Sequence, residues 1–230
     1  MNESSACMWA GKLLPVLDAA LGSAHVRPKR AKGRALEELI ADFPELVDIG
    51  VLTDGVERPV RRPKDKDKQK KQYSGKKRHH TTKRVTIVHP KSQYILATSD
   101  EYDGTRHDKK IADELKLQCR SPIPIGADSG FEGWTAGLAK LILPIKRKRK
   151  KKGEPKDKLT DEQKAYNKAL ASSRIAVEHS NAGFKRNRSA ADILRNTREG
   201  MGAQFTIVAM GLHNLRVVMR TSYQAHCQTG

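Results

Sequence analysis

The sequence has few cysteines and no long hydrophobic run, and each shortage excludes a class of protein. Its three cysteines are far apart and show neither Cys-x-x-Cys nor Cys/His spacing, so neither a disulfide framework nor a zinc site is indicated. We therefore expect a reducing compartment. The most apolar stretch, Ala6 to Leu21, is interrupted by Lys12, Pro15 and Asp18 and falls short of the roughly 20 residues of a membrane span. We expect no membrane partner and a cytoplasmic location.

The chain is too short for a large multidomain enzyme. Its 230 residues fit one domain with a short addition. Hydrophobic residues make up 37% of the chain and charged residues 31%, which leaves enough apolar side chains for one core, so we do not expect wholesale disorder.

Acidic residues are in the minority, with 26 Asp and Glu against 45 Lys and Arg, for a formal net charge of +19. The excess lies in two segments. Arg61 to Arg84 holds 12 basic residues and two acidic ones, Lys146 to Lys158 holds nine and two, and together they carry +17. Two dense basic segments on a nearly neutral remainder favour a polyanionic partner, and therefore nucleic acid. The alternative is a pair of solvated loops that keep the protein in solution.

Hydrophobic patterning predicts a mixed α/β fold. Two apolar, β-rich runs joined by a four-residue loop form a hairpin, while the second basic segment lacks apolar periodicity and is expected to be a mobile loop. We expect helices at 9–21, 35–43, 107–117, 160–185 and 201–219, and strands at 47–54, 84–89, 94–98, 123–127 and 141–144.

The helix at 160–185 has the clearest pattern. Thr160 followed by Gln163 forms a capping box at its start, and helical spacing separates an apolar stripe from a polar face. The stripe, expected to face the core, is Tyr166, Leu170, Val177 and Phe184, and the polar face is Asn167, Arg174, Glu178, Asn181 and Lys185.

Three acids occupy positions that suit metal-dependent chemistry. Asp54 and Asp128 each follow a predicted strand, and Glu178 lies on the polar helix face. Carboxylates brought together this way hold hard divalent ions, and two such ions stabilise the attacking and leaving oxygens of a phosphoryl displacement. Each acid also has a simpler explanation, since Asp near Gly is a common turn residue and Glu178 can pair with Arg174 one turn earlier. That order is the less favourable one for an exposed pair.

Six segments share a pattern beyond these acids: Asp54-Gly55-Val56-Glu57-Arg58-Pro59, Tyr73-Ser74-Gly75-Lys76-Lys77, His80-Thr81-Thr82-Lys83, Gly104-Thr105-Arg106-His107-Asp108, Ala127-Asp128-Ser129-Gly130-Phe131, and Arg174 with Glu178 and Lys185. In order and spacing they resemble the catalytic domain of DDE transposases from bacterial insertion sequences, over about residues 44–220. Two departures are Ala171, where that family often has Tyr, and an N-terminal region shorter than the family's usual DNA-binding part.

The resemblance implies an α/β, ribonuclease H-like mixed sheet flanked by helices over residues 44–222. A short helical appendage over 1–43, equivalent to a truncated DNA-binding region, precedes it, and a tail over 223–230 follows. It further implies that Asp54, Asp128 and Glu178 are the catalytic triad and hold two Mg²⁺ ions, which Mn²⁺ can replace. The residues expected to bind DNA are Arg174 and Lys185 near the reacting phosphate, Lys76, Lys77 and Arg78 in the first basic segment, and Lys146, Arg147, Lys148 and Arg149 in the second.

The function that follows from the resemblance is a DNA transposase. Such an enzyme cuts phosphodiester bonds at element ends and joins the freed 3′-OH to target DNA; its partners are double-stranded DNA and further copies of itself, as a homodimer or higher oligomer, in the nucleoid. Two alternatives stay open. One is a non-catalytic DNA-binding protein derived from a transposase, and the other is a ribosomal type of RNA-binding protein, which the spacing of the acids disfavours. The roles of His107 and Asp108, which open a predicted helix, stay ambiguous.

Overall fold

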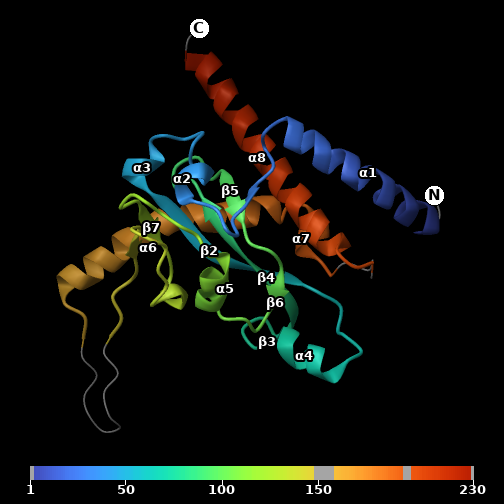
Figure 1. The fold of residues 1–230 in the computed structure, drawn as a ribbon, viewed down its shortest axis with the longest axis horizontal. Coiled ribbons are helices and arrows are strands. Elements are labelled where there is room, and N and C mark those ends of the chain that lie inside the picture. The colour runs from blue at the N-terminus through green and yellow to red at the C-terminus, as the bar shows by residue number, and fades with distance from the viewer. Residues whose placement is uncertain (1–2, 148–157, 194–197, 229–230) are drawn as a thin grey trace.

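The structure, a computed structural model, describes residues 3–147, 158–193 and 198–228. Its centre is an eight-stranded mixed sheet with helices on both faces (Figure 1). The helices are α1 (Glu3–Ser23), α2 (Leu36–Leu39), α3 (Leu46–Ile49), α4 (Lys66–Gln72), α5 (Asp108–Leu115), α6 (Asp161–Phe184), α7 (Arg188–Ala191) and α8 (Met201–Gln228), with a 3-10 turn η1 (Ser129–Phe131). The strands are β1 (Lys29–Arg30), β2 (Val51–Pro59), β3 (Tyr73–Ser74), β4 (His79–Val88), β5 (Ile95–Thr98), β6 (Tyr102–Asp103), β7 (Pro124–Gly126) and β8 (Lys140–Ile142).

The strand order is β1-β5-β4-β2-β7-β8, with β3 and β6 also paired to β4. Strands β2, β4 and β5 run antiparallel to their neighbours within that group, whereas β7 and β8 continue the sheet in parallel with β2. This confirms the predicted fold class, a ribonuclease H-like mixed sheet flanked by helices. Among the described residues, no helix is both long enough and apolar enough to cross a membrane.

The central strand β2 separates two cores because alternate residues of a strand face opposite sides of the sheet. Leu52 and Val56 pack in one cluster with Val177 of α6, while Val51 packs in another with Ile111 of α5. Helices α5 and α6 therefore cover opposite faces, as Figure 1 shows. Helix α8 packs beside α6 and also against α1.

Residues before the expected boundary at residue 43 contact the sheet as well. Strand β1 pairs in parallel with β5, and the side chains of Leu36 and Leu39 are buried in the cluster that contains Val51. This packing joins the two parts through one core. The division into an appendage over 1–43 and a catalytic domain over 44–222 stays a prediction.

Helix α6 confirms the predicted capping box, because the Thr160 hydroxyl accepts from Gln163 N at 3.2 Å and the Gln163 side chain accepts from Thr160 N at 3.1 Å. The predicted apolar stripe is correct only in the second half of the helix. Phe184 is buried, but Tyr166 is 42% exposed. The reason is visible in Figure 1, where the first turns of α6 project past the edge of the sheet.

Two predicted elements are wrong in their bounds. Only 36–39 of the expected helix 35–43 is helical. The expected strand 47–54 begins as helix α3, and the strand starts at Val51, after Gly50 turns the chain with φ +74°. Asp54 is therefore in the middle of a nine-residue strand and not at its end. Strand β2 continues to Pro59 because β4 pairs with it from Leu52 onward. The remaining predicted helices and strands are confirmed to within a few residues, apart from α1, β4 and α8, which are longer than predicted.

Candidate active site

Asp54 is an acidic residue on the apolar face of the central strand. It lies between Leu52 and Val56, both buried against α6 and α8. Burial raises the pKa of the Asp54 carboxyl to about 6. Arg174 opposes this rise in pKa, whereas the carboxylates of Asp128 and Asp108 add to it. The strand thus places a negative charge where the protein compensates it only in part.

Asp128 comes to Asp54 through the parallel pairing of β2 with β7. The register pairs Leu52 with Gly126, the last residue of β7, and paired strands lie about 4.8 Å apart. Two residues further along each segment are Asp54, still within β2, and Asp128, in the turn after β7. The Asp128 carboxylate accepts a hydrogen bond from Gly130 N at 2.7 Å, which fixes the turn after β7. The structure therefore brings these two predicted site residues together.

Helix α6 contacts Asp54 through two side chains of its polar face. Arg174 Nη2 is 3.7 Å from Asp54 Oδ1, and Asn181 Nδ2 donates to Asp54 Oδ2 at 3.2 Å. Glu178 lies between them on the same face, since residues three and four apart are neighbours on a helix, and it is exposed to solvent. Within the described residues Arg174 pairs with Asp54 and makes no ion pair with Glu178.

Asp108 is a nearby carboxylate whose role the sequence left open. It begins α5 on the other face of the sheet, where Asp108 Oδ1 is 3.2 Å from Lys83 Nζ. His107 caps the helix, with its Nδ1 accepting from Lys109 N at 3.4 Å. A side chain at Gly55 would collide with the Asp108 carboxylate, so the glycine after Asp54 permits this approach. In the sequence, the Asp54-Gly55 pair was the only local indication that Asp108 comes close to this strand.

The side chains of the candidate site have the chemistry that a divalent cation requires, but they are not arranged around a single metal position. Asp54 and Asp128 provide the carboxylate oxygens that Mg²⁺ prefers, and a cation would stabilise the ionised form of Asp54, whose pKa is raised by burial and by the neighbouring Asp128. Across residues 3–147, 158–193 and 198–228, no group of three or more His, Cys, Asp or Glu side chains is arranged to hold a metal ion. To complete the predicted triad, the Glu178 side chain must turn from solvent toward the aspartates.

The first basic segment meets α6 beside this site. Lys185 Nζ donates to the backbone oxygen of Glu57 at 2.7 Å, and burial, followed by the charge of Lys77, lowers the pKa of Lys185. Lys77 and Lys185 line a common hollow of about 630 Å³. The neighbouring Lys76 and Arg78 are exposed in the turn between β3 and β4. Lys77 and Lys185, which belong to two different predicted groups of DNA-binding residues, thus lie beside the same hollow.

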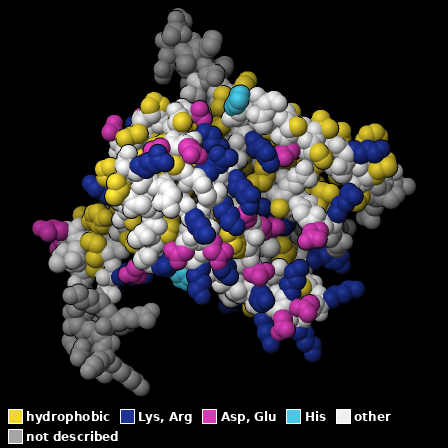
Figure 2. Space-filling view, viewed as in Figure 1, with side chains coloured by type: hydrophobic (Ala, Val, Ile, Leu, Met, Phe, Trp, Pro, Cys, Tyr) yellow, Lys and Arg dark blue, Asp and Glu magenta, His cyan; other side chains and the backbone are white. Residues whose placement is uncertain are grey.

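The second basic segment starts close to the Asp128 turn. Lys146 Nζ is 2.6 Å from Glu132 Oε2 and donates to the Ser129 oxygen at 3.2 Å. Arg147 is exposed, whereas the predicted DNA-binding residues Lys148 and Arg149 lie outside the described residues. Figure 2 shows further Lys and Arg side chains gathered over α4, at the lower right of the view.

A mixed sheet with one aspartate on its central strand and a second just after the neighbouring parallel strand defines a ribonuclease H-like domain with a candidate metal-dependent site. Residues 53–214 match the family model described as DDE superfamily endonuclease, and the chain belongs to that family. This confirms the resemblance seen in the sequence. The chain is also 31% identical over 170 residues to the probable transposase for insertion sequence element IS702 of Microchaete diplosiphon.

That alignment covers 74% of this chain and 58% of the relative. The chain therefore spans less than two thirds of the length of this curated relative. No solved structure matches the chain.

Proposed function

We propose that the chain is a metal-dependent DNA transposase that cuts phosphodiester bonds at insertion-sequence ends and transfers the 3′-OH strand to target DNA. The observation that carries this proposal is the closeness of Asp54, on β2, to Asp128, just after the parallel strand β7, with the Glu178 face of α6 packed against Asp54. Family membership and the relative described as a probable transposase support it.

Asp54, Asp128 and Glu178 would hold two Mg²⁺ ions, or Mn²⁺ in their place. When bound, such ions activate the nucleophile and stabilise the charge of an in-line phosphoryl transfer. Asn181 holds the Asp54 carboxylate in position, because it donates to Asp54 Oδ2 at 3.2 Å and accepts from the Thr86 hydroxyl at 3.4 Å. It thereby fixes the plane of the Asp54 carboxylate.

Arg174 and Lys185 would bind phosphate on either side of the acids. Arg174 Nε is buried and has no hydrogen-bond partner in the described structure, and its ion pair with Asp54 is long. A guanidinium with an unused donor suits a phosphate oxygen, for which charge-assisted hydrogen bonds are strong. We further propose that the protein acts as a homodimer or higher oligomer on double-stranded DNA, in the nucleoid.

A cleavage assay on DNA that carries the element's own ends tests this function. We expect Mg²⁺-dependent cutting by the wild type and none by Asp54→Asn, Asp128→Asn or Glu178→Gln, all of which keep the side-chain size. Glu162→Gln, an exposed acid on the first turn of the same helix, is the matched control and should cut normally. Normal cutting by Glu178→Gln would remove that residue from the site, and inactive wild type would refute the catalytic proposal.

The second candidate function is a transposase-derived protein that binds DNA without cutting it. The lack of a closed three-acid group among the described residues favours it. Binding of end DNA with no cutting in either Mg²⁺ or Mn²⁺ would decide for this candidate.

A further inference from the structure

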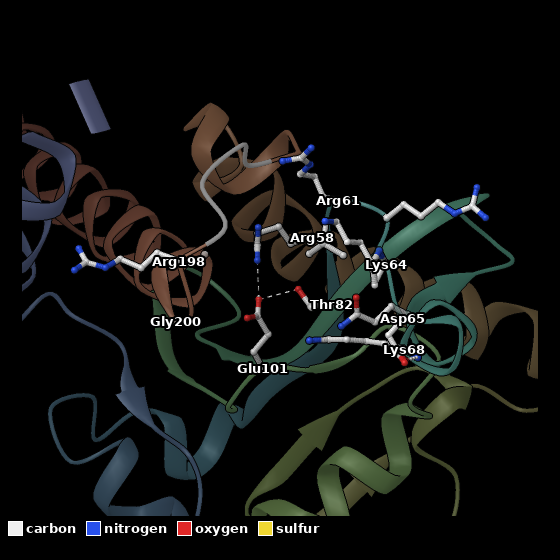
Figure 3. Close-up of a pocket in the computed structure, with 14 residues that line it drawn as sticks. Arg58, Arg61, Lys64, Asp65, Lys68, Thr82, Glu101, Arg198 and Gly200 are labelled. Carbon is white, nitrogen blue, oxygen red and sulfur yellow. Dashed lines mark hydrogen bonds and ion pairs between the residues drawn. The ribbon is translucent and has the colours of Figure 1, made fainter. Parts of the chain in front are cut away.

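A second basic hollow lies at the end of strand β2, lined by residues of the first basic segment to which no role has been assigned so far. Its volume is about 750 Å³, and it is lined by the end of β2, the loop to α4, α4 itself and the start of α8. Figure 3 shows this pocket with Arg58 and Glu101 joined across it. Arg58 follows Asp54 by four residues on the same face of the strand, so the two are about 13 Å apart at about 3.3 Å per residue.

The charge of this pocket is positive and only partly compensated. Five of its basic residues are Arg58, Arg61, Arg62, Lys64 and Lys68, against two acids. Both acids are already engaged. Asp65 Oδ1 caps α4 by accepting from Lys68 N at 2.6 Å, and Glu101 Oε1 accepts from Arg58 at 3.1 Å and from the Thr82 hydroxyl at 2.7 Å.

The exposed cations of the pocket have no acidic partner of their own. Within the described part of the chain, Arg61, Lys64 and Lys68 make no ion pair, and their side chains are exposed. Lone exposed cations are common on any surface, but here three of them surround one hollow whose lining contains no aromatic side chain. This composition suits phosphate groups and offers no surface for stacking bases.

Arg58 is the feature that distinguishes this pocket from a solvated basic face. The residue is only 8% exposed, and its Nε is buried without a hydrogen-bond partner in the described structure. A buried guanidinium normally uses its donors. The two terminal nitrogens of the Arg58 guanidinium lie against Gly202 in the first turn of α8.

We propose that this pocket binds backbone phosphates of the DNA that enters the active site, with Arg58 as the buried anchor and Arg61 and Lys64 as outer contacts. The inference rests on the proposed function, since it assumes DNA at Asp54. A distance of about 13 Å corresponds to about four base pairs of rise at 3.4 Å per base pair. The pocket therefore fixes the duplex flanking the cut and adds no sequence reading, because phosphate contacts position the protein without specifying bases.

The test measures how binding of a 30-base-pair duplex depends on salt, by fluorescence anisotropy without Mg²⁺ so that no cutting occurs. The variant is the double change Arg61→Gln with Lys64→Gln, at exposed positions where folding is preserved. Lys91→Gln is the matched control, because Lys91 is exposed in the β4–β5 loop, at the opposite end of β4 and about 20 Å from Thr82 at about 3.3 Å per residue.

We expect the slope of log affinity against log salt to fall by about 1.8 in the double variant, at about 0.9 per lost phosphate contact, and to stay unchanged in Lys91→Gln. Equal slopes in all three proteins, or a wild type that does not bind duplex, would overturn the pocket. A wild type that binds duplex with the expected slopes but never cuts its own ends would overturn the proposed function and leave the pocket assigned.

Discussion

Replacing Asp54 with Asn should make the protein more stable at pH 8 in the absence of divalent ions. The Asp54 carboxyl has its pKa raised from 3.8 to about 6, so the folded state holds the proton more tightly than the unfolded chain does. The stability that protonation provides is complete below the unfolded pKa and is lost as the pH rises through 6. Two pKa units correspond to about 3 kcal/mol. Arg174 loses its counter-ion in the variant, so we expect a net gain of about 1 to 3 kcal/mol at pH 8.

Urea denaturation in EDTA at pH 5 and pH 8 measures this gain. The difference in unfolding free energy between Asp54→Asn and wild type should be larger at pH 8 than at pH 5, because wild-type Asp54 is largely protonated at the lower pH. Asp48→Asn, an exposed aspartate of α3, should show no such pH dependence. A variant equally stable with wild type at both pH values, or less stable at pH 8, would show that the buried charge of Asp54 is fully compensated in the wild type.

Three further outcomes follow from the contacts around the site. Asn181→Leu should lower the cleavage rate and shift its pH profile, because the Asp54 carboxylate loses a donor; single-turnover rates from pH 5 to pH 9 check this, and an unshifted profile at a lower rate would indicate a merely structural role. Gly55→Ala should destabilise the fold by about 1 to 3 kcal/mol through a clash with the Asp108 carboxylate, and Asp108→Ala should relieve most of that loss in a double-mutant cycle of thermal melts. Glu101→Gln should tighten duplex binding at 50 mM salt, since it frees a basic pocket from its own carboxylate, and weaker binding by a folded variant would contradict this.

The sequence predicts the order of helices and strands because most of them carry their own periodic pattern. The capping box of Thr160 and Gln163 is such a local signal. The course of β2 is not local. Thr53 to Pro59 contains polar residues and glycine that resemble a turn, and only its pairing with β4 keeps this segment extended. The sequence therefore predicted Asp54 as a candidate site residue but placed it at the end of a strand.

Sequence patterns could not predict the contacts that cross the sheet. Asp108 acts on Asp54 from the opposite face, through a gap left by Gly55. Arg58 and Glu101 are far apart along the chain and meet only because β4 and α8 flank the end of β2. Helix α6 is longer than the sheet that it covers, so Tyr166 belongs to a continuous apolar stripe and yet remains exposed. Each of these outcomes depends on tertiary packing, and the spacing of residues within a single helix or strand does not predict it.

The proposed function depends most directly on three carboxylates gathering around divalent ions when DNA is bound. Anomalous diffraction from Mn²⁺, measured on crystals of the protein with duplex DNA carrying the element's ends, locates those ions. We predict two Mn²⁺ peaks held by Asp54 and Asp128, with Glu178 turned inward from its exposed position to join them. Mn²⁺ peaks at other residues, or DNA bound with Asp54 still paired to Arg174 and no metal beside it, would contradict the account.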